Sequence, residues 1–281
     1  MSAAAAVEAA LGRRPRRLTP LTGGCIAEVY RVDLQDGERL VAKVAAEGGL
    51  DLEAFMLRYL AAESELPVPA VVYADDRLLL LDYVENGGGL GRTGETEAAE
   101  ILATLHGITS PRYGFERDTL IGPLRQPNPW HDDWCGFFAE QRLLHFGRVA
   151  LDSGHLPAAT LRDLETLCGK LPDLIGEAGP PSLVHGDLWA GNILMRDSRI
   201  AAFIDPAIHF ADAEVELAFS TLFGGPFGET FFRRYGELRP LRPGFFEIRR
   251  DLYNLYPLLV HTALFGGHYA RSVAGIVGRF L

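Results

Sequence analysis

One short segment constrains the fold of this chain more than any other. Residues 184–195 read VHGDLWAGNILM. Asp187 and Asn192 are separated by four residues of loop, so both side chains can turn toward one point. A hairpin predicted over 193–204, with an Asp-Ser turn, would bring Asp205 of an Ile-Asp-Pro triplet back to the same place. The pattern therefore predicts a carboxylate, an amide and a second carboxylate at one site.

These side chains suit phosphoryl transfer to an alcohol. That reaction needs a carboxylate to orient the hydroxyl group and accept its proton, and oxygen ligands to hold Mg²⁺ against the nucleotide phosphates. Asp187 can fill the first role, and Asn192 and Asp205 the second. A His-x-Asp string alone would be explained equally well by a chance loop around a buried histidine. The amide and second acid in register favour the catalytic interpretation.

A family resemblance follows from the same residues. The string His-Gly-Asp-x-x-x-x-Asn followed by Ile-Asp-Pro resembles the catalytic loop and metal-binding acid of aminoglycoside phosphotransferases and fructosamine kinases. The resemblance implies an α+β, bilobal, protein-kinase-like fold with a small β-rich N-lobe and a larger, mainly helical C-lobe. It also implies ATP and Mg²⁺ as cofactors. Protein kinases carry His-Arg-Asp and Asp-Phe-Gly instead.

The first third of the chain fits a β-rich lobe. Apolar and β-branched residues predict strands at 18–21, 27–33, 40–45 and 78–83, and apolar spacing predicts a helix at 52–60. Beyond the glycine-rich stretch at 85–89, helical spacing recurs at 97–106, 130–146 and 159–171. We therefore expect an N-lobe over residues 1–84 and a C-lobe over 85–281.

The predicted N-lobe carries residues suited to nucleotide phosphates. Lys43 lies inside an apolar strand, where burial is costly unless a counter-charge or a phosphate meets it. Glu53 resembles the helix glutamate that pairs with such a lysine in kinases. Gly23 and Gly24, before Cys25, can let backbone N–H groups approach phosphate oxygens. Taken singly, the lysine would be an edge-strand charge and the glycines an ordinary turn.

The strand at 78–83 ends at the predicted lobe boundary, where a ligand cleft is expected. It resembles the kinase hinge, in which main-chain groups near Asp82 and Val84 would bind the adenine edge. It is equally well described as a buried strand. Cys25 lies in the predicted phosphate loop, and the resemblance implies redox sensitivity there; the alternative is a small loop residue.

Further matches narrow the resemblance to the fructosamine and ketosamine 3-kinases. Trp189 follows Asp187 as in their His-Gly-Asp-Leu-Trp-x-Gly-Asn string, and residues 119–128 and 130–143 resemble their insert and the helix after it. The family's activity would be transfer of the ATP γ-phosphate to the 3-hydroxyl of a ketosamine, free or protein-bound, with deglycation as the result. Trp189 can stack on a sugar or an amine stem, or else lie in the core.

Two other functions stay open at this stage. One is a kinase for another small alcohol, such as an aminoglycoside, a choline-like amine or a sugar. The other is a nucleotide-binding regulator without turnover, which Asp187 argues against because a pure binder would not need it. The net charge of −10 disfavours nucleic acid as a partner. We expect a cytoplasmic protein without a membrane partner, as a monomer or a dimer.

Overall fold

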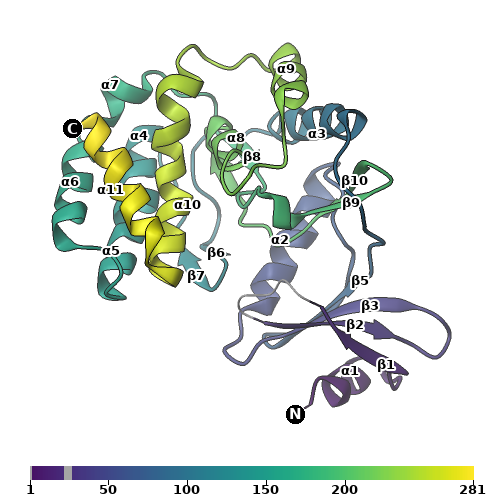
Figure 1. Ribbon diagram of the computed structural model, residues 1–281. Helices are drawn as coiled ribbons and strands as arrows, with labels where there is room; N and C mark the ends of the chain where they lie inside the picture. Colours follow the sequence, from purple (N-terminus) through teal and green to yellow (C-terminus); the bar gives the residue numbers. More distant parts are fainter. Residues whose placement is uncertain (1, 22–26) are drawn as a thin grey trace.

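The computed structural model describes residues 2–21 and 27–281. A β-rich N-terminal part lies beside a mainly helical C-terminal part, as expected (Figure 1). The N-terminal part contains α1 (Ala3–Leu11), β1 (Arg17–Pro20), β2 (Glu28–Asp33), β3 (Arg39–Val44), α2 (Leu50–Glu63), β4 (Val71–Ala74) and β5 (Leu78–Asp82). The predicted strands and the helix at 52–60 are confirmed, whereas α1 and β4 were not predicted.

The five strands of the N-terminal part form one antiparallel sheet in the order β1-β2-β3-β5-β4. Helices cover both of its faces. Val7 of α1 packs with Leu40 and Leu80 on one face, and Ala54 and Leu57 of α2 pack on the other. The opposite side of α2 joins the core of the helical part. Helix α2 therefore lies between the sheet and the C-terminal part and connects the two.

The C-terminal part contains the remaining elements. In chain order they are α3 (Arg92–Leu105), β6 (Thr119–Ile121), β7 (Leu124–Gln126), α4 (Trp134–Phe137), the π-helical segment η1 (Phe138–Leu144), α5 (His145–Asp152), α6 (Ala158–Cys168), α7 (Leu171–Ile175), β8 (Ser182–Val184), η2 (Ala190–Asn192), β9 (Ile193–Arg196), β10 (Arg199–Phe203), β11 (His209–Ala211), α8 (Glu214–Phe219), α9 (Glu229–Leu238), η3 (Phe245–Arg249), α10 (Arg250–Phe265) and α11 (His268–Phe280).

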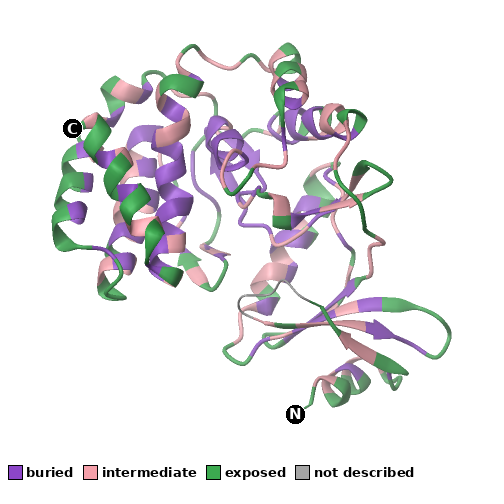
Figure 2. Ribbon diagram, in the orientation of Figure 1, coloured by how far each residue is buried: buried purple, intermediate pink, exposed green. Residues whose placement is uncertain are grey.

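Helix α10 lies at the centre of the helical core. It is buried along most of its length (Figure 2), and α5, α8, α11 and η3 pack against it. The Trp134 indole N–H donates to the Tyr253 hydroxyl across this core at 3.1 Å. None of the helices within residues 2–21 and 27–281 has the length and apolar character needed to cross a bilayer.

The helix predicted at 130–146 differs from the observed one at its start and in its middle. Asp133 is the N-cap, and its carboxylate accepts from the Gly136 N–H at 2.6 Å, so the helix begins at Trp134. Residues of η1 then widen into π-helical turns before α5 continues to Asp152. Such π-helical insertions are frequent near functional sites. The spacing of apolar residues in the sequence does not predict them.

The hairpin predicted over 193–204 is confirmed. Strands β9 and β10 pair antiparallel, and Asp197 and Ser198 at their turn have φ of 52° and 64°. Two successive left-handed residues match the twist of the strands they connect. The hairpin thus returns the chain beside its own start, because the Ile204 N–H donates to the Asn192 carbonyl at 3.0 Å.

Candidate active site

The loop after β8 carries the first catalytic candidates. Strand β8 pairs with β11, and Gly186 follows at φ 87°, in the left-handed region. A Cβ placed on Gly186 would lie 2.1 Å from the Ala207 carbonyl oxygen, so a larger residue does not fit. This close approach turns the chain so that Asp187 faces Asn192, which follows in η2.

Asp187 and Asn192 are in direct contact, as predicted. The Asn192 side-chain N–H₂ donates to the Asp187 carboxylate at 2.7 Å and to the Asp187 carbonyl at 2.9 Å. Burial raises the pKa of Asp187 to about 8, although the hydrogen bond from Asn192 opposes that shift. A carboxylate with such a raised pKa has the proton affinity expected of a general base.

Asp205 lies where the hairpin ends, at the junction with the N-terminal sheet. Its φ of 55° is unusual for a residue with a side chain and marks a backbone held by its surroundings. Its carboxylate forms an ion pair with Lys43, which comes from β3 in the other part of the molecule. The predicted metal ligand and the predicted phosphate-binding lysine therefore meet across the interface.

Lys43 is buried between two carboxylates. Besides Asp205, its Nζ donates to Glu53 of α2 at 2.7 Å. Burial alone would lower the pKa of Lys43, but attraction to Asp205 and Glu53 outweighs burial and raises it. The lysine is therefore charged, and the edge-strand alternative does not describe it, because β3 lies inside the sheet between β2 and β5.

The oxygen donors of this site suit a Mg²⁺ ion that is bound with a nucleotide. Among the described residues, no three His, Cys, Asp or Glu side chains gather in a metal-binding group. Mg²⁺ commonly rests on one or two protein oxygens and completes its octahedron with water and substrate phosphates. The Asn192 amide points its nitrogen toward Asp187, which leaves the amide oxygen for a cation. Asn192 and Asp205 thus fit a metal bound together with a nucleotide.

The hinge candidates lie at the end of β5. Asp82 is its last residue, and its N–H donates to the Ala70 carbonyl at 3.0 Å. Val84 follows outside the sheet, and its carbonyl accepts from the Asn86 side chain at 3.0 Å. Gly23, Gly24 and Cys25, the predicted phosphate loop, lie outside the described residues, so their roles stay predictions.

Trp189 lies in the catalytic loop, at the surface and not in the core. It is 36% exposed, and its ring folds back over Gly191, where a Cβ would approach it to 2.3 Å. Further aromatic rings follow it. The ring centroids of Trp189 and Phe223 are 6.4 Å apart, and the Phe223 centroid lies 4.4 Å from that of His261 and 6.0 Å from that of Tyr269. We call these four residues the aromatic wall.

Glu216 of α8 contacts the loop that carries Asp187 and was not predicted from the sequence. Its buried carboxylate accepts from the N–H groups of Gly186 at 2.6 Å and His185 at 3.2 Å, so it holds the backbone that presents Asp187. His106 contacts the same carboxylate at 2.8 Å. An acid within the apolar run of α8 is a signal for such a role, because burial there requires partners.

Replacing Glu216 with glutamine should lower the free energy of unfolding by about 1–3 kcal/mol, because an amide N–H₂ would then face backbone N–H donors. Urea denaturation of the purified chain measures this change. Glu237→Gln is the matched control: Glu237 pairs at the surface with Arg233 and Arg234, and its loss should cost little. Equal midpoints for both variants would contradict the anchoring role.

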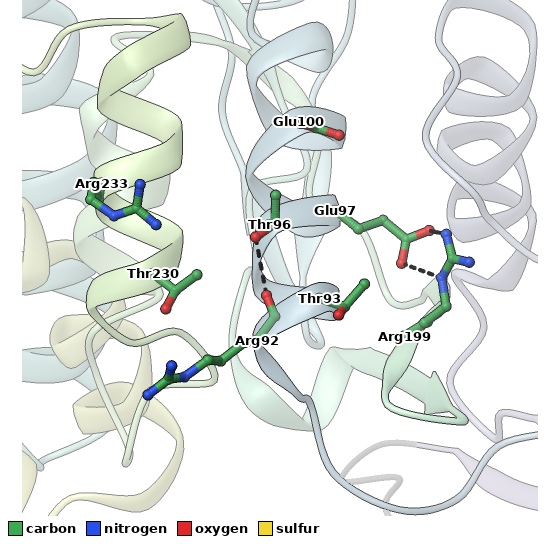
Figure 3. Close-up of a pocket in the computed structure, with 8 residues that line it drawn as sticks. All are labelled: Arg92, Thr93, Thr96, Glu97, Glu100, Arg199, Thr230 and Arg233. Carbon is green, nitrogen blue, oxygen red and sulfur yellow. Dashed lines mark hydrogen bonds and ion pairs between the residues drawn. The ribbon is translucent and has the colours of Figure 1, made fainter.

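A separate open cavity of about 570 Å³ lies between α3, α9 and β10. Figure 3 shows its polar lining, in which Arg199 pairs with Glu97 while Arg92 and Arg233 come from α3 and α9. None of the catalytic candidates lines it. The cavity is therefore separate from the Asp187 site.

Comparisons with known proteins identify the family. Residues 2–281 match the fructosamine kinase family. A probable ketoamine kinase of Vibrio parahaemolyticus is 36% identical over 93% of this chain and 91% of its own length. The chloroplastic protein-ribulosamine 3-kinase of Arabidopsis thaliana is 34% identical over 72% of this chain and 61% of its own length.

Solved structures show the same relationship. A crystal structure from Thermobifida fusca, assigned as a fructosamine-3-kinase, has a TM-score of 0.88 and 34% identity, and covers 99% of this chain and 97% of its own. An aminoglycoside phosphotransferase solved with AMP-PNP and hygromycin B has a TM-score of 0.69 and 17% identity, and covers 100% and 98% of the two chains. At that identity the second likeness shows the fold alone.

Fold and site together define a phosphotransferase of the protein-kinase-like fold. Asp187 contacts Asn192, and Lys43 contacts Asp205 and Glu53; these are residue types that this class uses. The chain belongs to the fructosamine kinase family.

Proposed function

We propose that this chain transfers the γ-phosphate of ATP to the 3-hydroxyl of a ketosamine, such as a fructosamine or ribulosamine on an amine or a protein, and so promotes deglycation. One observation carries the proposal. The Asp187–Asn192 pair lies on the C-terminal side of the interface, and the Lys43–Glu53 pair lies on the other side, with Asp205 in contact with Lys43. Family membership supports the choice of acceptor.

In the proposed reaction, the acceptor hydroxyl donates its proton to Asp187 while its oxygen forms a bond to the γ-phosphorus. The bond between that phosphorus and the bridging oxygen breaks, and ADP leaves with the electron pair. Lys43 binds phosphate oxygens, and Asn192 and Asp205 would hold Mg²⁺, which neutralises the charge of the transferring group. Val84 and the Asp82 carbonyl would bind the adenine edge.

The aromatic wall supports a sugar-bearing amine as the acceptor. Aromatic rings stack on the apolar face of sugars and attract cationic amines. Trp189 is joined to the catalytic loop, so an acceptor stacked on it would be held close to Asp187. Phe223 has a φ of 56°, a strained backbone of the kind that collects at ligand sites.

An acceptor screen tests the proposal. ATP consumption would be followed with fructosyl-lysine, ribosyl-lysine, choline, simple sugars and aminoglycosides, each with Mg²⁺. Turnover of the ketosamines is expected, with the phosphate located at the 3-hydroxyl by NMR. Turnover of an aminoglycoside or choline alone would assign a different acceptor, and nucleotide binding without turnover of any of them would favour a regulator.

Replacing Trp189 with alanine should raise the KM for a ketosamine by about tenfold, with the KM for ATP unchanged, since stacking contributes about 1 kcal/mol or more. Steady-state kinetics with each substrate varied in turn measure both constants. Trp130→Ala is the matched control, because Trp130 is similarly exposed at 39% but lies outside the catalytic loop. Equal effects of the two variants would remove Trp189 from acceptor binding.

A further inference from the structure

The hairpin of β6 and β7 has no part in the proposed reaction, yet it carries a row of buried polar side chains. Thr119 and Gln126 face each other across its first pair, and both are fully buried. Buried polar groups are costly unless they are hydrogen-bonded, so their partners indicate what the hairpin holds.

Gln126 holds the segment that follows Asp205. Its Nε2 donates to the Ala207 carbonyl at 3.0 Å and to the Thr119 hydroxyl at 2.9 Å. The Thr119 hydroxyl in turn donates to the Ile208 carbonyl at 3.3 Å. The two side chains therefore bind two successive carbonyl groups immediately after the Asp205-Pro206 pair.

Ala207 joins that segment to the catalytic loop. Its N–H donates to the His185 carbonyl at 2.7 Å, and its carbonyl oxygen lies against Gly186, directly before Asp187. His209 also contacts this oxygen at 3.1 Å, but it belongs to the same segment. Gln126 is the contact that comes from the hairpin, and it reaches the residue at which the two loops meet.

Gln126 is itself held in place from behind. Its side-chain carbonyl accepts from the Tyr256 hydroxyl of α10. The Asn128 amide donates to the Thr119 hydroxyl at 2.8 Å, and its oxygen accepts from Arg142 at 2.6 Å. Arg142 is fully buried in η1, and its other hydrogen bonds go to the Pro127 and Gln141 carbonyls. A continuous polar chain therefore runs from η1 to Ala207.

The outer face of the hairpin contacts the N-terminal part. Strand β6 packs against α2, and a Cβ on Gly49, directly before α2, would lie 3.2 Å from Leu120 Cδ1. One hairpin thus contacts both the helix that carries Glu53 and the segment that follows Asp205.

We infer that Gln126 is a positioning residue, through which the β6–β7 hairpin fixes Asp205 in the geometry that binds a nucleotide-bound metal ion. The inference rests on the metal role given to Asp205 in the proposed function. It assigns to the hairpin an effect on the metal-dependent part of nucleotide affinity.

The test is calorimetric titration of ADP, with excess Mg²⁺ and with EDTA, into the full-length chain and its Gln126→Met variant. Loss of partners behind a metal ligand costs about tenfold or more in metal affinity. The ratio of the ADP dissociation constant in EDTA to that in Mg²⁺ should fall about tenfold in the variant. Its dissociation constant in EDTA should stay within about twofold of the wild-type value. Leu124→Ala, in the same hairpin but outside the polar chain, is the matched control and should keep the wild-type ratio.

An unchanged ratio in Gln126→Met would overturn the inference, as would an equal loss in Leu124→Ala. If Gln126→Met does not fold, Tyr256→Phe replaces it, because this change removes only the hydroxyl that donates to Gln126. Tyr256→Phe should lower the ratio by about threefold. An unchanged ratio in Tyr256→Phe would also overturn the inference. If the ADP affinity of the wild-type chain does not depend on Mg²⁺, both the metal assignment and this inference are wrong. A metal-dependent wild type with an unaffected variant overturns this inference alone.

Discussion

Asp187→Ala should reduce kcat by about 10²- to 10⁴-fold, the usual contribution of a positioned general base. Asp187 is the carboxylate that Asn192 orients at 2.7 Å, and no other proposed role falls on it. Nucleotide affinity should change little, because Lys43 and Asp205 form the phosphate and metal side of the site. Single-turnover kinetics with saturating ATP and a ketosamine measure the loss.

The conservative variant separates chemistry from packing. Asp187→Asn keeps the size of the side chain but cannot accept a proton, so it should be impaired as strongly as Asp187→Ala. Binding of an ATP analogue with Mg²⁺ shows whether either variant keeps its nucleotide site. A variant that turns over at the wild-type rate would exclude Asp187 from the reaction.

Asp205→Ala should change nucleotide affinity in opposite directions with and without metal. Loss of an outer-shell partner alone costs about 10- to 100-fold in metal affinity, so loss of the carboxylate should lower affinity for the Mg²⁺ complex by about 100-fold or more. In EDTA, the variant should bind ADP at least as tightly as the wild type, because Lys43 is released from the ion pair with Asp205 and one negative charge is removed.

Asp197→Ala is the matched control for this experiment. Asp197 lies in the turn of the same hairpin, and its side chain is 86% exposed. Removing it takes away the same charge but no contact with Lys43. If both variants lose affinity equally in Mg²⁺, the effect comes from net charge, and Asp205 is not the ligand.

The local parts of this molecule could be predicted from its sequence. Asp187 and Asn192 are linked by one loop, and Asp205 follows one hairpin, so their placement depends on short-range geometry that turn residues specify. A partner for Lys43 was predicted because burial of a lysine demands a counter-charge, and the resemblance to kinases implied Glu53. The structure places the two side chains 2.7 Å apart.

Contacts between distant segments could not be predicted in the same way. Glu216 reaches the catalytic loop from another element, and Gln126 reaches the segment after Asp205. No spacing rule relates Gln126 to Ala207 across 81 positions of the chain. The π-helical η1 also has no periodic signature of its own. Helix α1 was missed because its nine residues are mostly alanine, which favours a helix without marking a buried face.

The ion pair between Lys43 and Asp205 has a consequence for the order of binding. The lysine neutralises the carboxylate that would hold the metal ion. A free cation would have to displace a buried ammonium group and leave it with Glu53 as its remaining partner. Nucleotide phosphates offer Lys43 new acceptors and so release Asp205. Metal and nucleotide should therefore enter together as one complex, and free Mg²⁺ should be a poor first ligand.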